Sequence, residues 1–163
     1  MRHPRKSKRL RHGRFSGPGH IYLVTICCEQ RKPVFRNIDL GRIVIDQFEH
    51  SDRSGGTATF AFVVMPDHLH WLVALANNKT LETVVGHFKG RAARQINLMR
   101  GKTGKLWQPG FHDHALRHEE GVQSAGNCVI YNPVRAGLAK TLEDYRLWGA
   151  TWIDGSGWPR IRP

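Results

Sequence analysis

The stretch TATFAFVVMPDHLHWLVAL, residues 57–75, decides the fold that the sequence predicts. Its first half alternates and then becomes continuously apolar, which is typical of a strand inside a sheet. Pro66 and Asp67 interrupt this pattern, and a second apolar run with strand character begins at His68. The sequence therefore predicts two strands in direct succession, which is the arrangement of an antiparallel pair.

Helical and strand patterns surround this pair of strands. A β-branched run at residues 21–28 predicts a first strand, and residues 39–50 have apolar positions at helical spacing. A long amphipathic helix follows Thr80, and residues 106–117 contain another strand. A further helix over residues 119–131 ends before Pro133, because a proline disfavours helical geometry in the preceding residue.

The order is therefore β-α-β-β-α-β with one more helix. It predicts an α+β, ferredoxin-like split βαβ fold, in which helices cover one face of an antiparallel sheet and the extra C-terminal helix follows. We expect a basic flexible arm over residues 1–18, a globular domain over 19–140, and a C-terminal extension over 141–163 that packs on the domain.

The charge of the chain points to a polyanionic partner. Its 163 residues include 25 Lys and Arg against 13 Asp and Glu, a formal net charge of +12. Nucleic acid is the first candidate for so basic a globular protein. The sequence has no long apolar run and no secretory signal pattern, and its three cysteines lack a framework spacing. We expect a cytoplasmic, nucleoid-associated protein with reduced thiols and no membrane span.

The second strand of the pair carries two histidines, His68 and His70, inside an apolar run. Residues two apart on a strand point to the same side, so the two imidazoles converge as a divalent metal requires. The alternative is that both rings pack and hydrogen-bond without a metal, as most histidines do. Asp67 is expected to be a turn residue, and His112 and His114 are possible supporting groups.

Four blocks of sequence resemble one family. VVMPDHLHWLV resembles the histidine-hydrophobic-histidine motif of the HUH single-strand DNA endonucleases. Together with GHIYLVT, LWQPGFHDHALR and NPVRAGL, it makes about residues 13–153 similar to the REP-associated tyrosine transposases, which are relatives of the single-tyrosine insertion-sequence transposases. The four blocks in this order are far more specific than the histidine motif alone.

The resemblance implies a metal-dependent transposase. Its two histidines would bind Mg²⁺ or Mn²⁺, which polarises a scissile phosphate in single-stranded DNA beside a hairpin. A tyrosine would then form a covalent 5′-phosphotyrosine and release a 3′-hydroxyl, a step that can reverse to rejoin the strands. No nucleotide cofactor is implied.

The chain departs from the family at the nucleophile. The family places a tyrosine four residues before the asparagine of the NPV block, and here Cys128 stands at that position. Tyr131 lies three residues further along and would be a nucleophile in a shifted register. Asn132, four residues after the nucleophile position, is either a third metal ligand or a helix cap.

Basic and aromatic residues supply candidate DNA contacts, and Arg135 could instead bond carbonyls at the helix end. Trp107 could stack on an unpaired base or belong to the core. The candidates are Arg2, Arg5, Lys6, Lys8, Arg9, Arg11, Lys89, Arg91, Arg94, Lys102, Lys105, Trp107 and Arg135.

Two functions therefore stand. The first is an active endonuclease and transposase that uses Tyr131 or Cys128 on single-stranded or hairpin DNA. The second is a domesticated DNA-binding protein that has lost strand cleavage. A covalent protein–DNA adduct would separate them. The sequence leaves open whether the protein is a monomer or a homodimer.

Overall fold

The computed structural model describes residues 20–76, 78–117 and 120–153 of the chain. The strands are β1 (Ile21–Cys27), β2 (Thr57–Met65), β3 (His68–Leu75), β4 (His112–Ala115) and β5 (Trp148–Ala150). The helices are α1 (Ile38–Arg53), α2 (Leu81–Arg100), α3 (Val122–Ile130) and α4 (Asn132–Arg135). Neighbouring strands are antiparallel in the order β4-β1-β3-β2-β5. This order confirms the predicted split βαβ fold.

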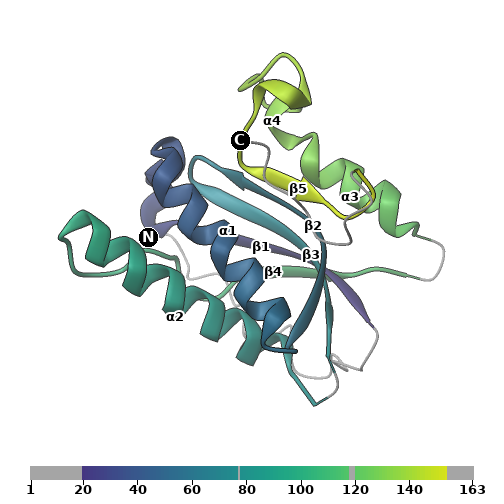
Figure 1. The fold of residues 1–163 in the computed structure, drawn as a ribbon, viewed down its shortest axis with the longest axis horizontal. Helices are drawn as coiled ribbons and strands as arrows, with labels where there is room; N and C mark the ends of the chain where they lie inside the picture. Colours follow the sequence, from purple (N-terminus) through teal and green to yellow (C-terminus); the bar gives the residue numbers. More distant parts are fainter. Residues whose placement is uncertain (1–19, 77, 118–119, 154–163) are drawn as a thin grey trace, which may run out of the picture.

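Helices cover both faces of the sheet (Figure 1). The helices α1 and α2 lie side by side on one face, and α3 with α4 lies on the other. The two faces explain why β2 and β3 read as nearly continuous apolar runs. A strand that is covered on both sides exposes neither face to water, so the side chains on both faces are apolar.

The core beneath α1 and α2 is built around stacked aromatic rings. Phe48 of α1 stacks on Phe62 of β2 and on Phe88 of α2, with ring centroids 4.8 and 4.9 Å apart. Trp71 of β3 joins this group, and its indole Nε1 donates a 2.9 Å hydrogen bond to Thr59 Oγ1. The one polar atom of a fully buried tryptophan is thereby satisfied.

The other face holds a smaller core between the sheet and α3. It contains Val63 of β2, Leu72 of β3, Val129 and Ile130 of α3, and Trp148 of β5. Residues 148–150, within the C-terminal extension that the sequence predicted, form the edge strand β5 against β2. This strand was missed because three residues carry too little periodicity to be recognised.

The helix ends follow local capping chemistry. Thr80 caps α2 as predicted, since its Oγ1 accepts from the Thr83 amide at 3.2 Å. The cap of α1 is Asn37, whose Oδ1 accepts from the Asp39 amide at 3.0 Å. Gly101 ends α2 at φ +58°, a conformation that glycine adopts without strain. The NPVR block forms the one-turn helix α4.

Candidate active site

The paired histidines lie on the α3 side of the sheet. Leu69 and Trp71, between and beside them, belong to the core under α1 and α2, so His68 and His70 face the opposite way. Their ring centroids are 4.9 Å apart and their planes are nearly perpendicular at 85°. The two imidazoles therefore present neighbouring nitrogens to one region of space.

Each histidine has an oxygen partner at Nδ1. Asp67 Oδ1 lies 2.6 Å from His68 Nδ1, and Thr25 Oγ1 lies 2.8 Å from His70 Nδ1. With Nδ1 engaged in this way, the lone pair available to a metal on each ring is at Nε2. Such partners orient the ring and select its tautomer at histidine metal sites. The pair therefore fits a divalent ion that accepts imidazole ligands.

The surroundings of His70 keep its ring neutral. Burial is the main cause that lowers the pKa of His70 to about 4, and the charges of His68, Arg135 and Arg31 act in the same direction. A neutral imidazole retains the lone pair that metal binding requires.

Arg31 holds Asp67 in place. Its Nε lies 2.9 Å from Asp67 Oδ2, and its Nη1 donates to Cys27 Sγ at 2.9 Å. Arg31 belongs to the 3₁₀ turn η2 (Glu29–Arg31), where Gln30 and Arg31 have φ of +53° and +55°. Two such residues in succession are unfavourable unless the surrounding contacts compensate. The turn therefore aims a guanidinium at the carboxylate that orients His68.

The strand register brings further side chains into line with His70. Thr25 of β1 is opposite both His70 of β3 and His112 of β4, so all three lie on the same face. His112 is exposed. His114 lies on this face too, but its Nε2 is 3.1 Å from Glu120 Oε2, so it fixes the segment after β4.

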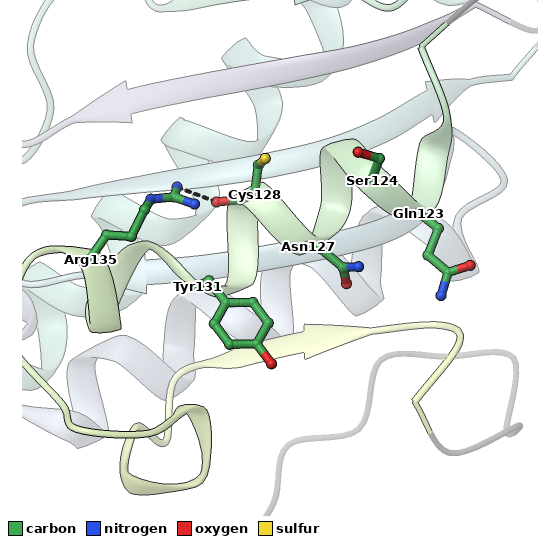
Figure 2. Close-up of a pocket in the computed structure, with 6 residues that line it drawn as sticks. All are labelled: Gln123, Ser124, Asn127, Cys128, Tyr131 and Arg135. Atoms are coloured by element: carbon green, nitrogen blue, oxygen red, sulfur yellow. Dashed lines mark hydrogen bonds between the residues drawn. The ribbon is translucent and has the colours of Figure 1, made fainter.

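The outer surface of α3 carries both nucleophile candidates. Cys128 and Tyr131 are exposed and line an open pocket of about 470 Å³ together with Arg135. Figure 2 shows the Tyr131 ring extending toward β5 and the Cys128 sulfur pointing to the opposite side of the helix. The two groups therefore aim at different places, although they are only three residues apart.

Asn132 and Arg135 complete the end of α3. The Asn132 side-chain amide donates to the carbonyls of Cys128 and Val129 at 3.1 and 3.0 Å, which is the capping role. Arg135 Nη2 donates to the Cys128 carbonyl at 2.5 Å (Figure 2). In the described ranges, no three or more His, Cys, Asp or Glu side chains form a group that could hold a metal. The remaining ligands of a metal on the histidine pair would be amide, water or phosphate oxygens.

Two of the predicted DNA contacts make hydrogen bonds within the fold. Lys89 Nζ donates to the carbonyls of Gln108 and Gly110 at 2.8 Å each, so it ties the loop before β4 to α2. Arg91 Nε donates to Gln47 Oε1 at 3.1 Å and joins α2 to α1.

Of the two alternatives for Trp107, the structure shows the core position. Only 6% of its surface is exposed, and its Nε1 donates to the Lys89 carbonyl at 3.1 Å. Arg94, Lys102 and Lys105 are exposed. The candidates Arg2, Arg5, Lys6, Lys8, Arg9 and Arg11 lie outside the described residues.

Sequence reasoning missed Thr25 and Arg31 and placed Asp67 only in the turn. The adjacency of Asp67 to the histidine motif was a usable signal, because a turn lets a carboxylate reach the next side chain. Nothing in the sequence could pair Thr25 with His70, which is 45 residues away.

Comparisons with known proteins show which family the chain belongs to. Residues 18–120 match the family described as IS200-like transposases, so the chain belongs to that family. A Haemophilus influenzae protein assigned as a REP-associated tyrosine transposase is 25% identical in an alignment 97 positions long that covers 53% of this chain. The match spans 55% of the length of that relative.

Two further likenesses cover most of the chain. An uncharacterized protein of Haemophilus influenzae is 23% identical over 81% of this chain and 89% of its own length. A solved structure of a REP-associated tyrosine transposase bound to a REP hairpin has a TM-score of 0.69 at 19% identity. That likeness covers 92% of this chain and 86% of the other, and it establishes the shared fold.

Proposed function

We propose that this chain cleaves and rejoins single-stranded DNA beside REP-type hairpins in a metal-dependent reaction at the nucleoid. The observation that carries the proposal is the pair His68 and His70, whose Nδ1 atoms are both engaged, so that Nε2 is the nitrogen each ring can offer to a metal. Family membership and the net charge of +12 support it. Of the helices in the described ranges, none is both long and apolar enough to cross a lipid bilayer.

The residues of the chain have separate tasks in this proposal. His68 and His70 would hold Mg²⁺ or Mn²⁺, while Asp67 and Thr25 fix their orientation. Magnesium and manganese both favour oxygen ligands, so water and phosphate oxygens would complete the coordination of either ion. A bound ion would supply Lewis acidity and a template for the scissile phosphate. Arg135 adds positive charge at the same place, as its effect on the pKa of His70 indicates.

Tyr131 supplies the hydroxyl in the proposed strand cleavage. Its oxygen attacks the phosphorus, the bond from phosphorus to the 3′-oxygen breaks, and that oxygen takes a proton to become a 3′-hydroxyl. The tyrosine proton passes to solvent, and the product is a 5′-phosphotyrosine that the 3′-hydroxyl can attack in reverse. Cys128 is the alternative nucleophile, and its thiol would form an S–P bond in the same way.

A denaturing gel tests the proposal. The substrate is a hairpin with a single-stranded extension and a fluorophore at its 3′ end, so that a covalent 5′-phosphate adduct carries the label. With Mn²⁺ we expect a labelled protein band that His68→Ala/His70→Ala abolishes. Tyr131→Phe should remove the band if the tyrosine is the nucleophile, and Cys128→Ser should remove it if the thiol is. Hairpin binding by the wild-type chain without any adduct would contradict the enzymatic proposal.

A further inference from the structure

A basic cleft lies between the turn that follows β1 and the loop that follows α2. Its volume is about 150 Å³, and four cationic residues, Lys32, Arg100, Lys102 and Lys105, line it. Among the described residues of the lining, Glu29 alone is acidic. The cleft therefore carries a net charge of +3 from these side chains (four cations less one carboxylate).

The cations of this cleft are available to a ligand. Among residues 20–76, 78–117 and 120–153, their side chains have no hydrogen-bond or ion-pair partner. Glu29 does not pair with these cations, and its Oε2 is buried without a hydrogen-bond partner in the same ranges. This distinguishes the cleft from Lys89 and Arg91, whose hydrogen bonds are made within the fold. Four cations gathered around a single carboxylate favour an anionic ligand.

Hydrogen bonds hold the walls of the cleft in position. The Asn97 side-chain amide donates to the Gly104 carbonyl at 2.9 Å, and the Lys102 amide donates to the Asn97 carbonyl at 2.9 Å. The Glu29 amide donates to the Leu106 carbonyl at 2.8 Å, which joins the two walls. Because the frame is already formed, ligand binding requires little ordering of the backbone.

The cleft is connected to the histidine pair through the turn that follows β1. Glu29, which lines the cleft, is in the same 3₁₀ turn as Arg31, which bonds Asp67 beside His68. The Cys28 amide donates to the Asp67 carbonyl at 2.9 Å, so this turn is tied directly to the start of β3. One turn therefore contributes both to the lining of the cleft and to the contacts of the histidine motif.

We propose that the cleft binds one backbone phosphate of the single-stranded DNA that flanks the cleavage site. The described lining has no aromatic residue on which a base could stack, and its volume suits a phosphate group rather than a duplex. Lysine and arginine donors are the usual partners of phosphate oxygens. This inference rests on the proposed function, because it takes DNA as the polyanion.

Inorganic phosphate tests the cleft without DNA. We expect phosphate added to the full-length, ¹⁵N-labelled protein to shift the amide resonances of residues 101–105, with a smaller effect in Lys102→Gln/Lys105→Gln. The matched control is Lys79→Gln/Lys140→Gln, which removes the same charge from two exposed lysines outside the cleft. Equal phosphate shifts in the wild type and the cleft variant would overturn the proposal.

Salt dependence of DNA binding tests the ligand. Anisotropy of a labelled hairpin, with and without its single-stranded extension, is measured over a range of KCl concentrations. For the extended hairpin, the cleft variant should reduce the slope of log K against log salt by about 1, and the control variant should change it less. Equal effects of the two variants, or an equal effect of the cleft variant on the hairpin without its extension, would overturn the single-strand assignment. Phosphate binding in the cleft without any DNA binding by the wild type would instead refute the proposed function.

Discussion

The carboxylate of Asp67 lies 2.6 Å from Nδ1 of His68, and its second oxygen lies 2.9 Å from Arg31 Nε. The Asp67 side chain thus connects the metal-ligand candidate to a guanidinium in the turn that follows β1. Since the carboxylate is anchored at both oxygens, the His68 ring has a defined tautomer and direction before any ion arrives.

Removal of this carboxylate should weaken metal binding. We expect Asp67→Ala to lower the affinity for Mn²⁺ by about 10–100-fold, because partners of this kind typically contribute that much. Asp67→Asn retains an acceptor for the ring and should lose less. Calorimetric titration with Mn²⁺ measures the change, with circular dichroism to verify folding. Asp39→Ala, an exposed carboxylate near Arg42, is the control and should bind as the wild type does.

Thr25 allows the same test of metal affinity for the His70 ring. Thr25→Val keeps the shape of the side chain but leaves His70 Nδ1 without its 2.8 Å partner. We expect Mn²⁺ affinity to fall by about 10-fold, while Thr25→Ser, which retains the hydroxyl, stays close to the wild type. If valine and serine behaved alike, the hydroxyl would have no part in orienting His70.

The tyrosine that the family places at position 128 can be restored by mutation. Cys128→Tyr places a phenol at an exposed site that points away from Tyr131 (Figure 2). We expect at least a tenfold gain in covalent adduct on the denaturing gel, since a misplacement of about 1 Å can cost a hundredfold in rate. Cys128→Phe controls for the added ring and should show no gain. Absence of a gain in the tyrosine variant would indicate that the scaffold no longer positions the strand.

The cysteines should differ sharply in reactivity. Burial is the main cause that raises the pKa of Cys28 to about 12, followed by the negative charge of Asp67. At pH 8 only ~1 in 10,000 of these thiols is the reactive thiolate, and raising the pH to 9 still leaves it rare. Cys128 is exposed, so iodoacetamide followed by mass spectrometry should modify it first. Fast labelling of Cys28 in the folded chain would show that the turn after β1 opens.

Packing of α3 against the segment after β5 depends on a glycine. A Cβ at Gly126 would lie 2.0 Å from Trp152 Cη2, so Gly126→Ala forces the ring or the helix to move. We expect a loss of about 1–3 kcal/mol in the free energy of unfolding, measured by chemical denaturation. Gly90→Ala in α2 is the matched control, because no atom lies within 4 Å of the new Cβ. That variant should gain roughly 0.5–1 kcal/mol from helix propensity.

Local periodicity in the sequence was sufficient to predict much of this fold. The alternation in residues 57–75 predicted β2 and β3, and the spacing of His68 and His70 predicted that both rings share one face of their strand. The i, i+3, i+4 pattern after Thr80 predicted α2. These features succeed because neighbours in sequence decide them: a strand repeats every two residues and a helix every 3.6.

Partner choice was decided only by the tertiary structure. Lys89 looked like a phosphate contact, but in the fold it bonds carbonyls 19 and 21 residues away. Trp107 looked available to a base and is buried, while Lys32 and Arg100 come together with Lys102 and Lys105 in one cleft.

The sequence by itself thus determined the split βαβ order, the shared face of the histidines, and the cysteine at position 128. The tertiary structure decided which oxygen each ring meets, which cations remain free, and where Tyr131 points (Figure 2). The physical reason is that strand register and helix packing bring distant segments together, and a hydrogen bond forms only with the group that they place within about 3 Å.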